Sequence, residues 1–328
     1  MPRLRALIIM VAAANADNLR GLPRAIVRAR GVYVDPTKVT DPITANTVLM
    51  VSFNLGYMHF FRNWVCHAQR LGLKYLAWPE ETGAHRAVMD SDACRDNCTL
   101  YFSPHLSTMF SITPKPSDFR WMTFNAISKF KFVSVLSALR LGAHIWFSDV
   151  DIAFIRDPWP FMLEVQGDGR CDYVFQTNNR QLGSLYRRGS AGNTGFHFFR
   201  ASPLVKDFLN QSISFMYRNK ELDDQTLFWD HLNRADYDLI NETSSRWQSV
   251  NCGQSQSTNC KKLQICPLDS SLFTIGKANE SFLREHASII YHANYLVGSG
   301  EKRDALSQRG LWLLQASACQ PFPTDRYP

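Results

Sequence analysis

The chain has 328 residues, of which 45% are hydrophobic and 20% are charged, a composition that is typical of a folded protein and argues against a disordered chain. Its formal net charge of +7 favours anionic partners, among them small molecules with phosphate groups. The basic residues are dispersed and no RNA-binding or zinc-finger signature occurs, so we expect no nucleic-acid partner.

The N-terminal part of the chain differs from the rest. Residues 1–17 combine two early arginines, an apolar run from Ala6 to Ala14 and small residues up to Ala16, which predicts a signal-like or anchor-remnant segment; a stray apolar strand is the alternative. Residues 18–45 contain prolines and basic residues without clear periodicity and are expected to form a stem or an N-terminal wrap before a folded domain at 46–328. No later segment approaches the ~18 apolar residues of a membrane helix. We therefore expect membrane association at most through the N-terminal segment.

Cysteines and glycosylation sequons indicate the secretory pathway. The chain has eight cysteines, an even number that is compatible with disulfide bonds, and no CxxC pair that would favour zinc. Acceptor sequons for N-glycosylation occur at Asn97, Asn210, Asn241 and Asn279. We therefore expect disulfide bonds and a location in the Golgi lumen. The pairing of the cysteines stays open, and buried cysteines in a cytosolic enzyme are the alternative.

The first predicted elements of the domain are a strand, a helix and a second strand. Residues 48–53 form an apolar run, the apolar residues of 57–71 recur at helical spacing up to Gly72, and residues 74–78 form another apolar run. This order predicts a right-handed crossover in a parallel sheet, in which ligands bind at the carboxyl ends of the strands. Ser52 and Asn54 therefore lie at a candidate nucleotide-binding edge.

The later elements repeat this pattern. Helical spacing over residues 124–139 ends at Gly142, directly before an apolar run at 144–154 that predicts a buried strand. Ser202-Pro203 predicts the start of a helix that continues to about residue 217. Further strands are predicted at 172–176, 194–199 and 287–291, and a polar loop at 251–260. Since no internal repeat occurs, these elements indicate a single mixed α/β domain.

Two carboxylates, Asp149 and Asp151, interrupt the apolar run at 144–154. Ionised carboxylates at the end of a buried strand repel each other and lose hydration, so they require a cation or strong hydrogen-bond donors. Such oxygen ligands suit Mg²⁺ or Mn²⁺ together with the phosphates of a substrate. An Asp-rich turn that caps a helix is the structural alternative. A phosphatase of the haloacid-dehalogenase type is disfavoured, because Ala153 stands where that family has Thr or Val.

Further motifs accompany the aspartates. They are Arg62-Asn63-Trp64, Arg70-Leu71-Gly72, Leu139-Arg140-Leu141-Gly142, Arg156-Asp157-Pro158, Gly192-Asn193-Thr194-Gly195-Phe196, Asp223-Asp224-Gln225, and His292-Ala293-Asn294 with Gly298 and Lys302. With these motifs in this order, the chain resembles the nucleotide-diphospho-sugar transferases of the GT-A fold from about residue 47 to 314, and most closely the plant and algal arabinosyl- and xylosyltransferases. The resemblance implies a Rossmann-like α/β domain with a central, mainly parallel sheet flanked by helices.

The resemblance also implies a metal site. Asp149 and Asp151 would hold Mn²⁺ or Mg²⁺ together with the diphosphate of the donor. His292 would be a further ligand, although a single histidine at a strand end is more often a core residue. Gly298 would let a loop approach the phosphates closely, and Lys302 would offer them a positive charge.

Other residues would line the pocket of the donor sugar. The candidate catalytic residues are Asp224 and Gln225, near the anomeric carbon, and Asn193, beside the sugar. Gly195 would make room for the sugar. Lys131 is a second candidate for the donor phosphate or sugar, with a solvated helix lysine as the alternative. The acidic pair that includes Asp224 could also simply favour a helix N-terminus.

These implied roles predict a metal-dependent glycosyltransferase. It would move a pentose or hexose from a nucleotide-diphosphate donor, a UDP-sugar whose base or ribose contacts Ser52 and Asn54, to a glycan or glycoprotein acceptor. Retention of the anomeric configuration is implied, while the front-face and double-displacement routes both stay open. The alternatives are a catalytically weak member of the fold that binds glycans or supports a partner enzyme, and a metal-dependent hydrolase of nucleotide sugars.

Overall fold

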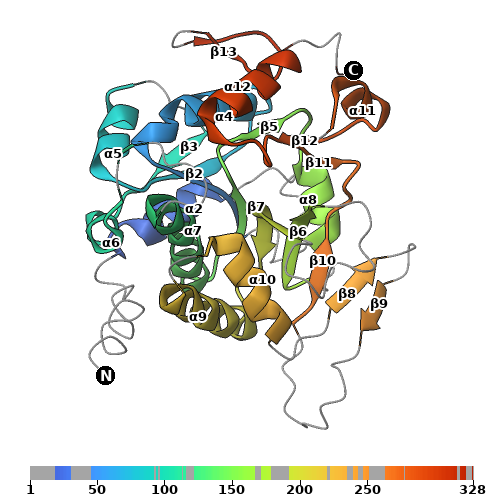
Figure 1. Ribbon diagram of the computed structural model, residues 1–328. Helices are drawn as coiled ribbons and strands as arrows, with labels where there is room; N and C mark the ends of the chain where they lie inside the picture. The colour runs from blue at the N-terminus through green and yellow to red at the C-terminus, as the bar shows by residue number, and fades with distance from the viewer. Residues whose placement is uncertain are drawn as a thin grey trace.

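The fold was obtained as a computed structural model. The structure describes residues 19–30, 46–91, 94, 97–112, 114–115, 122–166, 171–178, 192–219, 222–234, 239–242, 247–250, 263–276, 278–315, 318–322 and 327. Within these residues the chain forms three layers, in which a large central sheet lies between two groups of helices (Figure 1). The predicted signal-like segment and the predicted loop at 251–260 lie outside the described residues.

The central sheet is mainly parallel, as the sequence predicts. In spatial order its strands are β3 (Cys98–Leu100), β2 (Tyr75–Pro79), β1 (Thr47–Phe53), β4 (His144–Ser148), β7 (Gly192–Phe199), β6 (Tyr173–Thr177), β10 (Ile265–Pro267), β8 (Leu239–Glu242) and β9 (Trp247–Val250). Strand β7 is antiparallel to both of its neighbours, and β9 is antiparallel to β8. The remaining neighbouring strands pair in parallel.

Helices cover both faces of this sheet. One face packs against α2 (Leu22–Ala29), α6 (Pro104–Phe110), α7 (Met122–Arg140), α9 (Pro203–Arg218) and α10 (Asp224–Arg234). The other packs against α4 (Met58–Arg70), α5 (Thr82–Met89) and α8 (Trp159–Gln166). Within β1, Val48 and Met50 join the first core while Leu49 and Val51 join the second. A strand that is buried on both faces must be apolar at every position, which explains the continuous apolar run.

Apart from the strand at 144–154, the helix and strand predictions are confirmed with small shifts in their bounds. The predicted crossover runs from β1 through the short 3₁₀ helix η2 (Leu55–Tyr57) and α4 to β2, and it joins two parallel strands. Ser202 caps α9, since its hydroxyl accepts the backbone N–H of Val205. The late strand, β12 (Ile290–His292), begins after the predicted position, because Ala287 forms a turn with a positive φ of 47°.

The predicted single strand at 144–154 is wrong, because this run forms two strands in different sheets. Strand β4 ends at Ser148, and β5 (Ile152–Phe154) pairs in a second, three-stranded sheet with β12 and β11 (Phe273–Ile275). Between them the backbone N–H of Asp149 donates to Gly195 O at 2.6 Å, and Asp151 O accepts the N–H of Ala293 at 3.0 Å. The two aspartates therefore lie at the junction of the two sheets.

The segment predicted to lack periodicity contains a helix. Within α2, Leu22, Ala25, Ile26 and Ala29 are buried in the core, while Val27 is exposed. These residues recur at helical spacing, and they pack α2 into the core of the domain. The prediction missed this spacing because arginines and Pro23 separate the apolar residues.

Three disulfide bonds join segments of the domain. They link Cys66 to Cys319, Cys94 to Cys98, and Cys171 to Cys266. The first holds the C-terminal hairpin of β13 (Leu314–Gln315) and β14 (Ala318–Cys319) on α4. The other two cysteines, at 252 and 260, lie outside the described residues. The helices α11 (Glu280–Glu285) and α12 (Gly298–Gln308) complete the fold. None of the helices described is long and apolar enough to cross a membrane.

Candidate functional site

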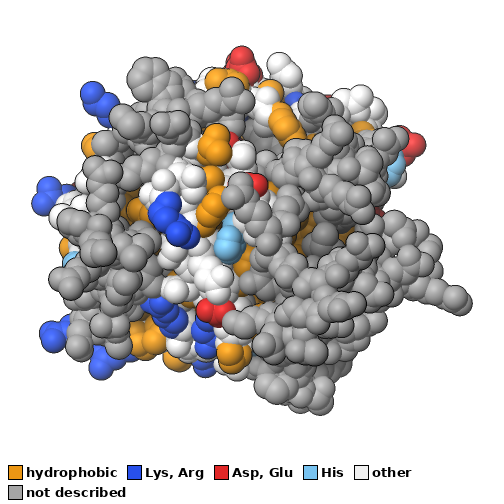
Figure 2. All heavy atoms as spheres, turned by 60° about the horizontal axis from the view of Figure 1, so that its bottom comes forward, with side chains coloured by type: hydrophobic (Ala, Val, Ile, Leu, Met, Phe, Trp, Pro, Cys, Tyr) orange, Lys and Arg blue, Asp and Glu red, His pale blue; other side chains and the backbone are white. Residues whose placement is uncertain are grey.

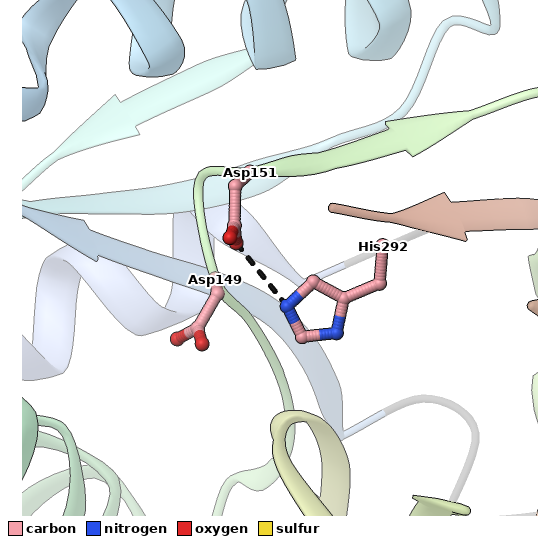
Figure 3. A group of neighbouring side chains, drawn as sticks. All are labelled: Asp149, Asp151 and His292. Atoms are coloured by element: carbon pink, nitrogen blue, oxygen red, sulfur yellow. Dashed lines mark ion pairs between the residues drawn. The ribbon is translucent and has the colours of Figure 1, made fainter. Parts of the chain in front are cut away.

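Three candidate metal ligands meet at the junction of the two sheets. Asp149 and Asp151 follow β4. His292 is the last residue of β12 and pairs with Ile152 of β5. One oxygen of each carboxylate and one ring nitrogen of His292 lie within 4.8 Å of one another. Figure 3 shows the Asp151 carboxylate and the His292 ring facing each other, with the side chain of Asp149 beside them. The pairing of β5 with β12 therefore brings the histidine next to the two aspartates, although more than a hundred residues separate them in the sequence.

Asp151 is held by two cationic or basic side chains. Its Oδ2 atom lies 2.6 Å from the Nζ atom of Lys302, and its Oδ1 atom lies 3.2 Å from the Nε2 atom of His292. Burial alone would raise the pKa of Asp151, but Lys302 and then His292 outweigh it, so the pKa lies well below its usual range. The ion pair has the opposite effect on the lysine: burial opposes its charge, and Asp151 raises the pKa of Lys302. Asp151 is therefore a carboxylate at every physiological pH.

A glutamine fixes the orientation of the His292 ring. The amide nitrogen of Gln176 donates to the carbonyl oxygens of Phe273 at 3.1 Å and Thr274 at 2.9 Å. Its oxygen Oε1 therefore faces the Nδ1 atom of His292, 2.8 Å away, and accepts a hydrogen bond from the Nδ1–H group. In the neutral ring, Nε2 then presents its lone pair to the carboxylate of Asp151. Two acceptors face each other at that point, an arrangement that a cation between them or a proton on Nε2 stabilises.

Gly195 leaves no space for a side chain beside the ligands. A Cβ atom at this position would overlap the His292 ring and lie 2.6 Å from Oδ2 of Asp149. The backbone is held on both sides, since its N–H donates to Oδ1 of Asn193 at 2.6 Å and its carbonyl accepts the N–H of Asp149. Asn193 and Gly195 thus lie directly against the candidate metal ligands. Glycine is required here by the close approach of these groups.

Lys131 is buried, and it lies among acidic side chains. Its Nζ atom is 2.8 Å from Oδ2 of Asp224 and 3.7 Å from Oδ1 of Asp149. It also donates to the carbonyl and the hydroxyl of Thr194, both at 3.1 Å. Burial opposes the lysine's charge, but Asp149 and Asp224 raise the pKa of Lys131. The interpretation as a solvated helix lysine is therefore wrong, because α7 directs this side chain into the protein.

Asp224 and Gln225 lie on the same network. The Oδ2 atom of Asp224 accepts the hydroxyl of Thr194 at 2.9 Å, and Oε1 of Gln225 accepts the Thr194 N–H at 3.3 Å. Asp224 is the first residue of α10, whereas its neighbour Asp223 accepts the N–H of Thr226. Asp223 thus has the helix-capping role, and Asp224 faces Lys131 in the interior.

The two residues predicted for the nucleotide are buried at the carboxyl end of β1. The Ser52 hydroxyl donates to Oε1 of Glu80 at 2.8 Å, and the Asn54 amide donates to the carbonyl of Lys115 at 3.0 Å. Glu80 follows β2 and is itself buried. Burial raises the pKa of Glu80 to about 8; the Ser52 hydroxyl lowers it and the charge of Asp149 raises it further.

The remaining predicted residues begin α12. Gly298 is the first residue of this helix and has a φ of +85°, a value that favours glycine. Lys302 follows one turn later on the same helix, which directs its side chain to Asp151. The sequence reasoning missed Gln176, Thr194 and Glu80. Each stands at a strand end or inside a quoted motif, and a polar residue that closes an apolar run was the available signal.

Basic, acidic, histidine and hydrophobic side chains gather near the middle of one face of the molecule. Figure 2 shows this face, with the described side chains between regions drawn in grey.

The sequence matches a family model described as nucleotide-diphospho-sugar transferase over residues 87–306. Two curated relatives are similar. One is the beta-arabinofuranosyltransferase RAY1 of Arabidopsis thaliana, 23% identical over 83% of this chain and 48% of the relative. The other is the UDP-galactose:fucoside alpha-3-galactosyltransferase of Dictyostelium discoideum, 27% identical over 58% of this chain and 28% of the relative. The chain spans about half the length of the first relative and less of the second.

Solved structures of glycosyltransferases are also similar at low identity. The galactosyltransferase LgtC in complex with donor and acceptor sugar analogues is 9% identical, with a TM-score of 0.46 over 81% of this chain and 96% of that one. The glycosyltransferase GlyE of Streptococcus pneumoniae is 12% identical, with a TM-score of 0.42 over 82% of this chain and 61% of that one.

Proposed function

Because the chain belongs to the nucleotide-diphospho-sugar transferase family, we propose that it transfers a pentose or hexose from a UDP-sugar to a glycan or glycoprotein acceptor, with a divalent cation and with retention of anomeric configuration. The relative from Dictyostelium uses UDP-galactose by its name, and the Arabidopsis relative transfers arabinofuranose by its name. Both names support the transfer of a sugar by this chain, and the fucoside in the Dictyostelium name supports a sugar-containing acceptor.

The observation that supports the proposal most is the group of three candidate metal ligands at the junction of the sheets. Two carboxylates and an imidazole within 4.8 Å suit Mn²⁺ or Mg²⁺, and Gly195 keeps the space beside them free of a side chain. Asp149, Asp151 and His292 would hold the ion, and Gln176 would keep Nε2 of His292 directed toward it. When bound, the ion supplies Lewis acidity to the diphosphate leaving group.

The residues of the chain itself would handle the charges of the reaction. Negative charge grows on the diphosphate as the bond to the anomeric carbon breaks, and the ammonium group of Lys302 would offset it from the second turn of α12. Positive charge grows on the sugar, and the carboxylate of Asp224 would stabilise it. Lys131 and Thr194 fix the position of that carboxylate through contacts of 2.8 and 2.9 Å. Asn193 and Gly195 would border the sugar.

We further propose a location in the secretory pathway, in the Golgi lumen. The three disulfide bonds between described cysteines are typical of proteins that fold in an oxidising compartment. Among the sequons, Asn279 is exposed at the start of α11, while the amide of Asn97 donates to the carbonyl of Gly72. Glycosylation at Asn279 would support the lumenal location, and peptide mapping after endoglycosidase treatment measures it.

Two other functions are separable from transfer. A metal-dependent hydrolase would release free sugar from UDP-sugars at the same rate with and without acceptor. A catalytically weak glycan-binding member of the family would bind UDP and glycans but convert neither.

The proposal is tested by Asp151→Asn. This change removes a ligand charge and leaves Lys302 beside a neutral amide, so Mn²⁺-dependent UDP binding in calorimetry should weaken by at least about tenfold and sugar transfer should be lost. Asp304→Asn is the matched control, since Asp304 is an exposed carboxylate on the same helix as Lys302 and should leave both quantities unchanged. Undiminished Mn²⁺-dependent UDP binding in Asp151→Asn would refute the metal assignment.

A further inference from the structure

Tyr295 lies in the connection between the candidate metal site and α12. It follows His292 by three residues and precedes Gly298 by three. The connection is anchored just before it, since the N–H of Ala293 donates to Asp151 O at 3.0 Å and Oδ1 of Asn294 accepts the N–H of Gly276 at 2.9 Å. The backbone of Tyr295 therefore has a fixed position beside the candidate site.

The backbone conformation of Tyr295 is unusual for its side chain. Its φ is +61°, in the left-handed region. Among the described residues, the other non-glycine residues with positive φ are Ser111 and Ala287, both with small side chains. A bulky aromatic residue in this region costs about 1 kcal/mol or more, and such strain persists mainly at functional sites. The chain uses glycine for the same purpose nearby, at Gly298 with a φ of +85°. A tyrosine at this point therefore requires a reason other than the turn.

Tyr295 also exposes a large apolar surface. It is 52% exposed, and Val297 in the same connection is 60% exposed. The exposed large hydrophobic residues of the described part also include Leu55, next to Asn54, and Leu222, two residues before Asp224. Tyr295 and Val297 thus expose apolar side chains in the connection from His292 to Gly298, whereas the interior of the site is charged. An exposed aromatic ring beside charged groups can contact a ligand that has both apolar and polar faces.

An exposed aromatic ring next to a charged interior suits one class of ligand, the sugars. A pyranose or furanose ring has hydroxyl groups at its edge and C–H groups on its faces. Its C–H face can pack on the negatively charged face of an aromatic ring while a hydroxyl reaches toward charged groups. An aromatic side chain has only two rotatable bonds, so on an anchored backbone it loses little conformational entropy when a sugar packs against it. We propose that Tyr295 packs against the C–H face of the acceptor sugar and positions it at the metal site; this rests on the proposed transferase function.

The decisive comparison uses Tyr295→Gly, Tyr295→Phe and Ala287→Gly. The first removes both the ring and the strained backbone, the second keeps the ring, and the third relieves a positive φ of 47° at the opposite end of β12. Binding is followed by saturation-transfer NMR in the presence of Mg²⁺ and UDP. The probes are methyl β-galactopyranoside, methyl β-xylopyranoside and methyl α-arabinofuranoside, with galactitol as an open-chain control without ring faces.

Tyr295→Gly should raise the midpoint of thermal unfolding by about 2 °C and weaken the affinity for the bound glycosides about three- to tenfold. Its Mg²⁺-dependent UDP affinity should not change. Tyr295→Phe should keep the affinity for the glycosides. Ala287→Gly should be more stable than wild type and should bind the glycosides with unchanged affinity. Equal glycoside affinity in Tyr295→Gly and wild type, equal losses in the Phe and Gly variants, or no glycoside binding to wild type would each overturn the proposal. Failure of UDP binding with ring-dependent glycoside binding intact would instead contradict the proposed function.

Discussion

Gly195 illustrates how a single hydrogen atom determines the geometry of the candidate site. Because a Cβ atom would overlap the His292 ring and approach Asp149, Gly195→Ala should displace both ligands. We expect Mn²⁺ affinity, measured by electron paramagnetic resonance, to fall about 10- to 100-fold, and the free energy of unfolding to fall by about 1–3 kcal/mol.

Gly300→Ala is the control for this change. Gly300 lies in α12, where an added Cβ meets no atom within 4 Å. Since glycine is unfavourable within a helix, this variant should be more stable by about 0.5–1 kcal/mol, with unchanged Mn²⁺ affinity. Unchanged affinity in Gly195→Ala as well would contradict the close packing of Gly195 against the ligands.

Glu80 should make the stability of the protein depend on pH. Its pKa is raised from 4.5 to about 8 on folding, so the folded state binds a proton that the unfolded state has lost between these values. The contribution of Glu80 to stability is therefore fully present below pH 4.5 and is lost as the pH rises toward about 8. Between about pH 5.5 and about pH 7.5, wild type should lose about 2 kcal/mol more than Glu80→Gln.

Chemical denaturation of the metal-free protein at the two pH values measures this difference. Glu285→Gln, at an exposed position of α11, is the control and should behave as wild type. If Glu80→Gln shows the same pH dependence as wild type, Glu80 is ionised in the folded protein and its raised pKa is refuted.

At the scale of elements, α9 supports the helix that positions Lys131. It packs against α7, and its first turn depends on the Ser202 hydroxyl, which accepts the N–H of Val205 at 3.2 Å. Ser202→Ala should lower the free energy of unfolding by about 1 kcal/mol. Ser214→Ala removes a hydroxyl inside the same helix, where the hydroxyl bonds only the Asn210 carbonyl, and should have a smaller effect. Equal losses in denaturant unfolding would show that the cap has no special role.

Elements that depend on local pattern were predictable, and those that depend on distant partners were not. The strand at β1, the helix α4 and the capped start of α9 each follow from neighbouring residues. The end of β4 does not, because only the distant partners Gly195 and Ala293 draw the chain at Asp149 and Asp151 out of the first sheet. The motifs of the chain were enough to predict His292 as a ligand. Gln176 was missed because its role depends on a distant partner: β6 places it beside the His292 ring.

At the scale of the whole molecule, the disulfide bond between Cys66 and Cys319 closes the longest covalent loop among the described cysteines, with 253 residues of separation. Replacing both cysteines by serine should lower the free energy of unfolding by about 3 kcal/mol, because the unfolded chain regains the entropy of that loop. The same replacement at Cys94 and Cys98, which are four residues apart, should cost less.

Denaturant unfolding of the two double variants measures these losses, and non-reducing peptide mapping tests the pairing. A peptide that joins Cys66 to Cys319 is expected. Titratable thiols at these two positions in the native protein would contradict both the pairing and the lumenal location proposed from it.

The pairing of each site aspartate with a lysine has a consequence for the life of the protein. Lys131 and Lys302 give Asp149 and Asp151 cationic neighbours from within the chain. For Asp151, Lys302 and His292 outweigh the effect of burial without any added ion, whereas burial raises the pKa of Asp149 even though Lys131 lowers it. The charge of Asp151 is therefore balanced within the chain before any ion binds. If the chain acts as proposed, the ion would enter and leave a finished protein together with each nucleotide.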